Sequence, residues 1–222
     1  MNPDRSDRFE ELRRRLVGNL CSAGYIKSER VRNAMLKVPR ELFVTDDLVS
    51  EAYVDTPLPI GYGQTISAPH MVAIMLEEQE FEPGQTVLEV GTGSGYHAAL
   101  AAELVRPGGK VYTIERIGEL AEFARRNISR AGYSDLVEVI EGDGSKGLPD
   151  KAPFDRIFVA CGAPDVPEPL IEQLADDGIM LVPVGGRYYQ DLIKVKKKKG
   201  RIVKENRGKC VFVPLIGEYG YD

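Results

Sequence analysis

VLEVGTGSG, residues 87–95, is the stretch of sequence that decides the fold. Its first four residues are a β-rich run, three glycines follow within five residues, and an Ala-rich segment then runs over 96–105. A strand that enters a glycine-rich turn and then a helix is typical of a βαβ unit. Glycines let the backbone approach a ligand where a Cβ atom would clash. A tight turn without ligand is the alternative, but three glycines exceed what one turn needs.

Downstream of this stretch, strand and helix patterns alternate. We expect strands at 111–114, 136–140, 156–160 and 179–184, and helices at 117–130 and 167–175. Such alternation predicts an α/β fold with a doubly wound, mostly parallel sheet. The C-terminal segment differs from this pattern. An antiparallel hairpin is predicted there, with strands at 189–197 and 201–206 joined by Lys-Lys-Gly at 198–200. We expect a last strand at 210–215.

Upstream, the pattern is helical. Apolar residues recur at helical spacing over 7–20, Ser28 can cap a second helix that Pro39 ends, and Pro69 suits the first turn of a third. Residues 52–69 read as loop or short extended pieces. We therefore expect one domain over 1–222: N-terminal helices in 1–80, a Rossmann-like α/β/α sandwich in 81–185, and an antiparallel C-terminal edge in 186–222.

Composition excludes several classes of protein. The chain has 222 residues, a net charge of −5, three Cys and two His, which argues against a general nucleic-acid binder, a disulfide framework and a metal centre. The few, scattered cysteines favour a reducing compartment. No run reaches the ~20 apolar residues of a membrane span, and the N-terminus has no apolar core of a signal peptide. We expect a cytoplasmic protein.

Two carboxylates indicate which ligand the glycine stretch binds. A dinucleotide fingerprint places its third small residue at position 96, which is Tyr96 here. Glu89 just before the loop is unfavourable for a pyrophosphate and suits a cationic or zwitterionic ligand. Glu115 ends the next strand, where an acidic residue about 20 positions after the first glycine binds ribose hydroxyls; a solvated strand-end Glu is the alternative.

A third carboxylate follows the next strand. Asp143 lies between Gly142 and Gly144 and could accept from an adenine amine, although Asp between glycines is also ordinary turn chemistry. Together the three strand ends predict a nucleoside cofactor site of the S-adenosylmethionine type. The cofactor-binding candidates are Glu89, Gly91, Thr92, Gly93, Ser94, Gly95, Glu115, Asp143 and Gly144.

Nucleic acid as the methyl acceptor is an alternative that the sequence leaves open. Amino-methyltransferases of bases usually carry Asn/Asp-Pro-Pro-Tyr after the fourth strand, where this chain has ACGAP at 160–164. Cys161 could serve as the nucleophile of a cytosine-C5 enzyme, or be a small buried residue. The basic stretch 194–204 could bind RNA, or be a solvated edge hairpin with Leu192, Val195, Ile202 and Val203 pointing inward.

The sequence resembles the protein-L-isoaspartate O-methyltransferases, especially their archaeal members. The segments that carry the resemblance are VPRE at 38–41, PIGYGQTISAPHM at 59–71, residues 87–96, YTIER at 112–116, GDG at 142–144 and FVPL at 212–215. The GQTIS-x-P part is the specific one, since other methyltransferases share the glycine loop. Two positions depart from the family pattern, Cys161 and His97, and neither removes a group that the family needs.

The resemblance implies methyl transfer from S-adenosylmethionine to the α-carboxylate of L-isoaspartyl residues in damaged proteins. S-adenosylhomocysteine is the other product, and the ester collapses to a succinimide. The family's active-site serine matches Ser67. We expect substrate contacts from Thr65, Ile66, His70 and Val213, the last through added-strand pairing, although His70 could equally be packed or on the surface. We expect a monomer without metal, nucleic acid or membrane as partner.

The chemistry of such a reaction agrees with the sequence. A free α-carboxyl has a pKa near 3.5, so it is already ionised at neutral pH and needs no general base. Ser67 precedes the expected helix start at Pro69, where backbone N–H groups and the helix dipole favour an anion. We interpret Ser67 as an orienting hydrogen-bond donor; a plain helix cap is the alternative. Other methyltransferases, of RNA or small molecules, and a non-catalytic nucleoside-binding module also remain open.

Overall fold

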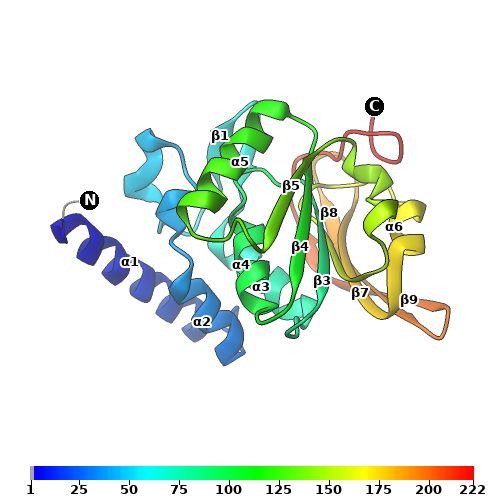
Figure 1. Cartoon of the computed structure of the whole chain (residues 1–222), viewed down its shortest axis with the longest axis horizontal. Helices are drawn as coiled ribbons and strands as arrows, with labels where there is room; N and C mark the ends of the chain where they lie inside the picture. The colour runs from blue at the N-terminus through cyan, green and yellow to red at the C-terminus, as the bar shows by residue number, and fades with distance from the viewer. Residues whose placement is uncertain (1–2) are drawn as a thin grey trace.

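A computed structural model describes residues 3–222, with side chains described from residue 7 onward. Within this range, strands form a seven-stranded sheet and a two-stranded hairpin (Figure 1). The hairpin is β1 (Leu58–Gly61) and β2 (Gln64–Ile66); the sheet has β3 (Thr86–Val90), β4 (Lys110–Glu115), β5 (Val137–Glu141), β6 (Phe154–Val159), β7 (Leu174–Gly185), β8 (Gln190–Lys198) and β9 (Arg201–Cys210). The α-helices are α1 (Pro3–Ser22), α2 (Glu29–Lys37), α3 (Pro69–Gln79), α4 (Tyr96–Leu104), α5 (Gly118–Arg130) and α6 (Glu168–Gln173).

The strand order of the large sheet is β5-β4-β3-β6-β7-β8-β9. β3 pairs in parallel with both β4 and β6, and the parallel pairing continues from β4 to β5 and from β6 to β7. The chain thus winds outward from β3 to β5 and then returns to β6 on the other side of β3. This reversal opens a crevice at the carboxyl ends of β3 and β6, where ligands bind in such sheets. The predicted doubly wound, mostly parallel sheet is confirmed.

Helices cover both faces of the sheet. Val87 and Leu88, successive residues of β3, belong to hydrophobic clusters on opposite faces, as strand geometry requires. Side chains of α1 to α5 join the cluster of Val87, and Leu170 of α6 joins that of Leu88. Figure 1 shows α6 on the other side of the sheet from α3, α4 and α5. The expected sandwich with an N-terminal helical extension is present.

The helix starts agree with the capping signals in the sequence. The Ser28 side chain accepts the Val31 N–H at the start of α2, and Pro69 is the first residue of α3. The helix expected over 167–175 is shorter, because β7 begins at Leu174 and pairs there with Phe154 of β6. Strand pairing overrides the local helical pattern at this point. Within residues 3–222, no helix combines the length and apolar character needed to cross a bilayer.

The C-terminal edge is antiparallel, as expected. β7 pairs with β8 and β8 with β9, and the β8–β9 turn has Lys199 and Gly200 at positive φ. The last strand predicted over 210–215 is wrong: β9 ends at Cys210, and residues 211–215 make one isolated bridge, between Pro214 and Gly162. The ladder stops because the Gln190 side chain accepts the Phe212 N–H and because proline has no N–H.

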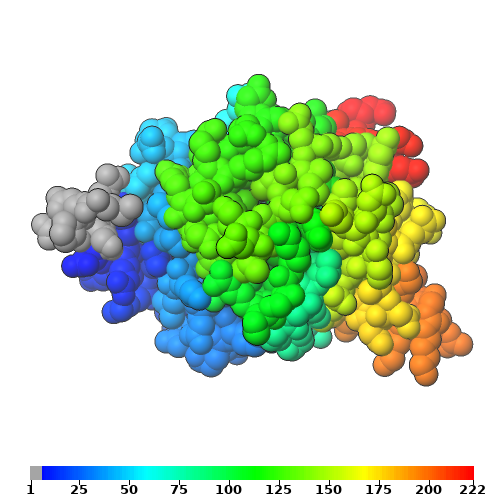
Figure 2. Space-filling view, in the orientation of Figure 1, coloured from blue at the N-terminus to red at the C-terminus, as the bar shows by residue number. Residues whose placement is uncertain are grey.

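Two of the four apolar hairpin residues expected to point inward do so. Leu192 and Val195 of β8 are buried, but Ile202 and Val203 of β9 are exposed. β9 is an edge strand of the sheet, so it pairs with a neighbouring strand on one side only. Figure 2 shows the hairpin tip projecting at the end of the molecule opposite the N-terminal helices.

One lysine of the basic stretch, Lys194, is almost completely buried. The Lys194 side chain is 3% exposed, and its Nζ lies 3.2 Å from Glu78 Oε2 and 2.6 Å from Glu80 Oε1. Arg207 of β9 also pairs with Glu78, at 2.6 Å. These ion pairs attach the basic hairpin to the C-terminal end of α3. Part of the positive charge is therefore structural and not available to RNA.

Candidate active site

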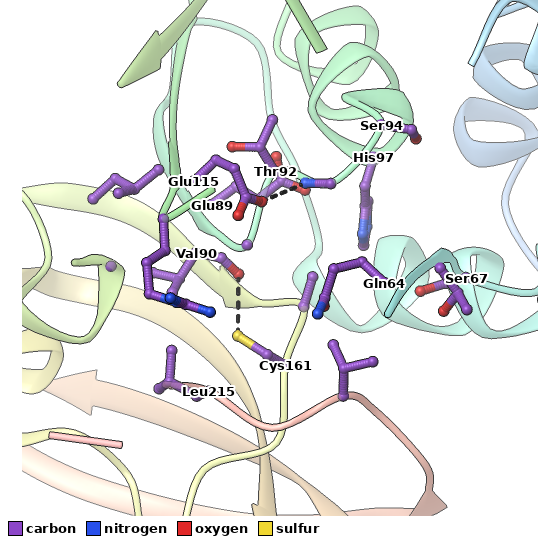
Figure 3. Close-up of a pocket in the computed structure, with 18 of the residues that line it drawn as sticks. Gln64, Ser67, Glu89, Val90, Thr92, Ser94, His97, Glu115, Cys161 and Leu215 are labelled. Atoms are coloured by element: carbon purple, nitrogen blue, oxygen red, sulfur yellow. Dashed lines mark hydrogen bonds between the residues drawn. The ribbon is translucent and has the colours of Figure 1, made fainter. Parts of the chain in front are cut away.

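A cleft lies at the carboxyl ends of β3, β4 and β6, where the strand order reverses. Segments far apart in the sequence meet there: the β2–α3 connection, the glycine loop with the start of α4, the end of β4, and the C-terminal segment after β9 (Figure 3). The lining residues are 64–67, 72, 89–94, 96–97, 114–117, 144, 160–161 and 213–216.

Most of the site residues expected from the sequence line this cleft. They are Thr65, Ile66, Ser67, Glu89, Gly91, Thr92, Gly93, Ser94, Glu115, Gly144 and Val213. Three other expected site residues do not line the cleft: Gly95, Asp143 and His70. Their surroundings give each of them a different role.

The glycines of the loop serve two different purposes. Gly91 has φ +91°, and a Cβ there would stand 3.4 Å from the Cys161 sulfur at the base of the cleft. Gly95 has φ +85°, and a Cβ there would come within 2.9 Å of Ile128 Cδ1. Gly95 therefore allows α4 to pack closely against α5. The expectation that it also contacts the cofactor stays a prediction.

Glu89 is a fully buried carboxyl with one free oxygen. Its Oε2 accepts a 2.6 Å hydrogen bond from Thr113 Oγ1, which lies 2.6 Å from Thr92 Oγ1 in the loop. Its Oε1 is buried and has no hydrogen-bond partner among the described residues. Burial, with the neighbouring Glu115 charge, raises the pKa of Glu89 to about 8 despite the hydrogen bond from Thr113. A cation at Oε1 would restore the ionised form.

Glu115 joins the end of β4 to the glycine loop. Its Oε2 accepts the Gly93 N–H at 2.9 Å, and its Oε1 accepts the Ile117 N–H at 3.0 Å. The two backbone donors fix the plane of the carboxylate at the cleft wall. Each oxygen retains a second lone pair, which is what a ribose diol would need.

Asp143 points away from the cleft toward the C-terminal tail. Its Oδ1 accepts the Ser145 N–H at 3.0 Å and hydroxyl at 2.6 Å, and its Oδ2 accepts the Glu218 N–H at 3.0 Å. Burial acts to raise the pKa of Asp143, but these hydrogen bonds outweigh it and lower the pKa. Its neighbour Gly144 lines the cleft, and a Cβ there would meet Val90 Cγ1 at 2.6 Å. In the structure Asp143 thus anchors the tail, and its adenine contact stays a prediction.

Ser67 lies between β2 and α3, at the positive end of the α3 dipole. Arg40 holds this segment from behind: its Nη2 donates to the Ser67 carbonyl at 2.8 Å, and its Nε donates to the Ala52 carbonyl at 2.9 Å. Ala68, the N-cap of α3, provides no side-chain cap; Pro69 has no N–H, and the His70 N–H donates to Asp55 Oδ1. Figure 3 shows Ser67 and Gln64 on the same side of the cleft, facing the glycine loop.

His70 lies on the outer side of α3. Its backbone N–H donates to Asp55 Oδ1 at 2.9 Å, its Nδ1 lies 3.0 Å from the same oxygen, and its ring packs on Tyr25 at 5.4 Å between centroids. The His70 side chain thus pairs with Asp55 outside the lining, and its contact with the substrate stays a prediction.

The opposite wall is formed by the segment after β9. The Gly162 N–H donates to the Val213 carbonyl at 2.8 Å, and the Leu215 N–H donates to the Gly162 carbonyl at 2.7 Å. Beneath it, the Cys161 thiol faces the Val90 carbonyl at 3.8 Å, and burial raises the pKa of this thiol far above its usual value. A protonated, buried thiol is a poor nucleophile, so nothing here supports a cytosine-C5 reaction.

Comparison with known proteins decides the family. The family model for protein-L-isoaspartate(D-aspartate) O-methyltransferase matches residues 11–220. The chain belongs to this family. A protein-L-isoaspartate O-methyltransferase of Hyperthermus butylicus is 61% identical over 96% of this chain and 92% of its own length, and one of Methanopyrus kandleri is 60% identical over 96% and 95%.

A solved structure of the same family agrees in fold. It is described as a protein-L-isoaspartate O-methyltransferase from Plasmodium falciparum in complex with S-adenosyl-L-homocysteine. It is 31% identical, has a TM-score of 0.83, and is matched over 92% of this chain and 98% of its own. The expectation drawn from the glycine loop and the GQTIS-x-P segment is confirmed.

Isoaspartyl methyltransferases use S-adenosylmethionine, and the cleft of this family member fits it. Glu89 Oε1 is a buried acceptor without a partner in the described part of the chain, as a site for an ammonium group requires. Gly91, at the base of the cleft, has φ +91°, a backbone conformation that favours glycine. Within residues 3–222, no group of three or more His, Cys, Asp and Glu side chains is arranged to hold a metal ion.

The structure also places several residues at the site that sequence reasoning missed. Gln64, His97 and Arg116 all line the cleft. Gln64 and Arg116 each lie next to a predicted site residue, which is the signal that could have found them. The signal for His97 is weaker. It is the second residue of the helix that follows the glycine loop.

Proposed function

We propose that this chain transfers a methyl group from S-adenosylmethionine to the α-carboxylate of L-isoaspartyl residues in damaged proteins. The ester then collapses to a succinimide, whose hydrolysis partly restores normal aspartate. The observation that carries the proposal is the position of Ser67. It lies at the N-terminus of α3, backed by the buried Arg40 guanidinium, and lines the same cleft as the glycine loop.

The reaction needs orientation more than proton transfer. When bound, the cofactor supplies an electrophilic sulfonium methyl, and the substrate carboxylate is ionised near neutral pH. The Ser67 hydroxyl, at the positive end of the α3 dipole, holds that carboxylate by a charge-assisted hydrogen bond. Burial lowers the pKa of His97 to about 3, so the one histidine in the cleft lining is no proton acceptor at neutral pH. Such a site suits a nucleophile that arrives already ionised.

We also propose a set of cofactor-binding residues, which the geometry of the cleft supports. Glu89 Oε1 receives the ammonium of the methionyl end, and Glu115 receives the ribose hydroxyls. Gly91, Thr92, Gly93 and Ser94 form the floor beneath the cofactor, and Gly144 leaves room at the adenine end. On the substrate side, Thr65, Ile66 and Val213 flank Ser67 and hold the peptide backbone.

We further propose that the protein acts as a cytoplasmic monomer on proteins and not on nucleic acid. Its cysteines are all free in the structure, which supports a reducing compartment. Lys194 and Arg207 are engaged in ion pairs with Glu78, which supports a structural role for part of the basic hairpin.

The test is an acceptor comparison. The protein is incubated with S-adenosylmethionine labelled in the methyl group and one of three acceptors: an isoaspartyl peptide, the same peptide with normal aspartate, or total RNA. We expect base-labile label in the isoaspartyl peptide only. Label in RNA, or in neither peptide, would contradict the proposal.

A further inference from the structure

His97 carries a buried nitrogen without a partner at the edge of the cleft. It is the second residue of α4, its side chain is 8% exposed, and its ring packs on Phe158 at 4.2 Å between centroids. Among the described residues, none gives its Nε2 a hydrogen bond. Burying a polar nitrogen in this way costs free energy, so the position favours a ligand that completes it.

The surroundings of His97 favour an anion as that ligand. The ring is neutral at physiological pH, because burial lowers its pKa to about 3, and so carries one N–H donor. It lies in the first turn of α4, whose unpaired N–H groups and dipole attract negative charge. Figure 3 shows His97 projecting from α4 into the space between Ser94 and Gln64.

A second unpartnered atom of the opposite kind lies in the same cleft. Glu89 Oε1 is a buried acceptor, whereas His97 Nε2 can be a buried donor, and both residues line the cavity. Glu89 precedes the glycine loop and His97 follows it, so the acceptor and the donor flank this loop. Such a pair can bind the cationic and the anionic group of one zwitterion. The methionyl end of S-adenosylmethionine is such a group, with an ammonium and a carboxylate on one carbon.

We propose that the His97 Nε2–H donates a hydrogen bond to the carboxylate of the cofactor's methionyl end. The proposal rests on the cofactor assigned under the proposed function and extends it to a residue outside the glycine loop. His97 is then a cofactor-binding residue that holds the methionyl chain while Glu89 holds its ammonium. The adenosine part of the cofactor makes no contact with His97.

The test uses two ligands that differ only in the group concerned. S-adenosylhomocysteine has the amino-acid end, whereas 5′-methylthioadenosine keeps the nucleoside and the sulfur but lacks it. Their affinities are measured by calorimetry for the unaltered chain, for His97→Phe and for His97→Gln. Phenylalanine preserves the ring contact with Phe158 and removes the nitrogen, whereas glutamine keeps a donor.

We expect His97→Phe to weaken S-adenosylhomocysteine about tenfold or more, with 5′-methylthioadenosine unchanged and a partial recovery in His97→Gln. An equal loss for both ligands would mean that His97 only supports the fold, and no loss for either would mean that it binds nothing. A rise in KM for the isoaspartyl peptide alone would place it against the substrate. Each of these three results would overturn the proposal. Failure of the unaltered chain to bind either ligand would overturn the cofactor assignment as well.

Discussion

The Arg40 guanidinium donates a 2.8 Å hydrogen bond to the carbonyl oxygen of Ser67. Arg40 is fully buried, its Nε donates to the Ala52 carbonyl, and its guanidinium carbon lies 5.0 Å from the centre of the Tyr96 ring. Asp55, which accepts the His70 N–H at the start of α3, interacts electrostatically with this buried cation. Arg40 is therefore a positioning residue that holds the backbone of Ser67.

Replacing Arg40 should separate substrate handling from cofactor binding. We expect Arg40→Met to raise KM for an isoaspartyl peptide by about tenfold and to lower the free energy of unfolding by about 1–3 kcal/mol, since two buried carbonyls lose a donor. Arg40→Lys should recover part of both, because it keeps the charge. Steady-state kinetics and urea unfolding measure these effects. An unchanged KM in Arg40→Met would remove the positioning role.

The Ser67 hydroxyl should matter for turnover and not for the cofactor. We expect Ser67→Ala to lower kcat about tenfold or more, since a donor to the reacting carboxylate is lost. Affinity for S-adenosylhomocysteine, measured by calorimetry, should stay near that of the unaltered chain. Full turnover in this variant would show that the hydroxyl is dispensable.

Glu89 should make stability depend on pH. Its pKa is raised from an ordinary value of 4.5 to about 8, so the folded state holds a proton that the unfolded state has released between these values. Stability from this group is therefore present below about pH 4.5 and is lost as the pH rises toward 8.

Glu89→Gln isolates that effect. It keeps the shape but cannot ionise, so it should be more stable than the unaltered chain by on the order of 2–3 kcal/mol near pH 7 and equal to it near pH 4. It should also bind S-adenosylhomocysteine more weakly. Urea unfolding at the two pH values provides the measurement; a difference that does not change with pH would refute the assignment.

Asp143 and Glu115 should behave differently although both end a strand. Glu115→Ala should weaken S-adenosylhomocysteine about tenfold, because ribose contacts and the Gly93 anchor are both lost. Asp143→Ala should mainly speed hydrogen exchange at the Glu218 amide, because Asp143 Oδ2 accepts a hydrogen bond from this N–H in the structure. If instead both variants lose cofactor affinity equally, Asp143 contacts the adenine after all.

Local patterns predicted the frame of this site well. The glycine loop, Glu89 and Glu115 at strand ends, and Pro69 at a helix start are short-range signals. Both carboxylates and loop residues 91–94 line the cleft, and Pro69 begins α3. The contacts that tune the site are long-range. Arg40 reaches Ser67 across 27 positions and Asp143 reaches Glu218 across 75, so neither follows from spacing. The burial of Lys194 likewise depends on Glu78 and Glu80 from a helix distant in sequence.

The central claim is that the cleft at Ser67 esterifies an isoaspartyl α-carboxylate. Mass spectrometry of one isoaspartyl peptide and its aspartyl counterpart, each followed over time with S-adenosylmethionine, tests it most directly. We predict that only the isoaspartyl peptide gains a methyl group and that it then loses methanol to form the succinimide. Equal methylation of both peptides, or a stable methyl group at any other residue, would contradict the account.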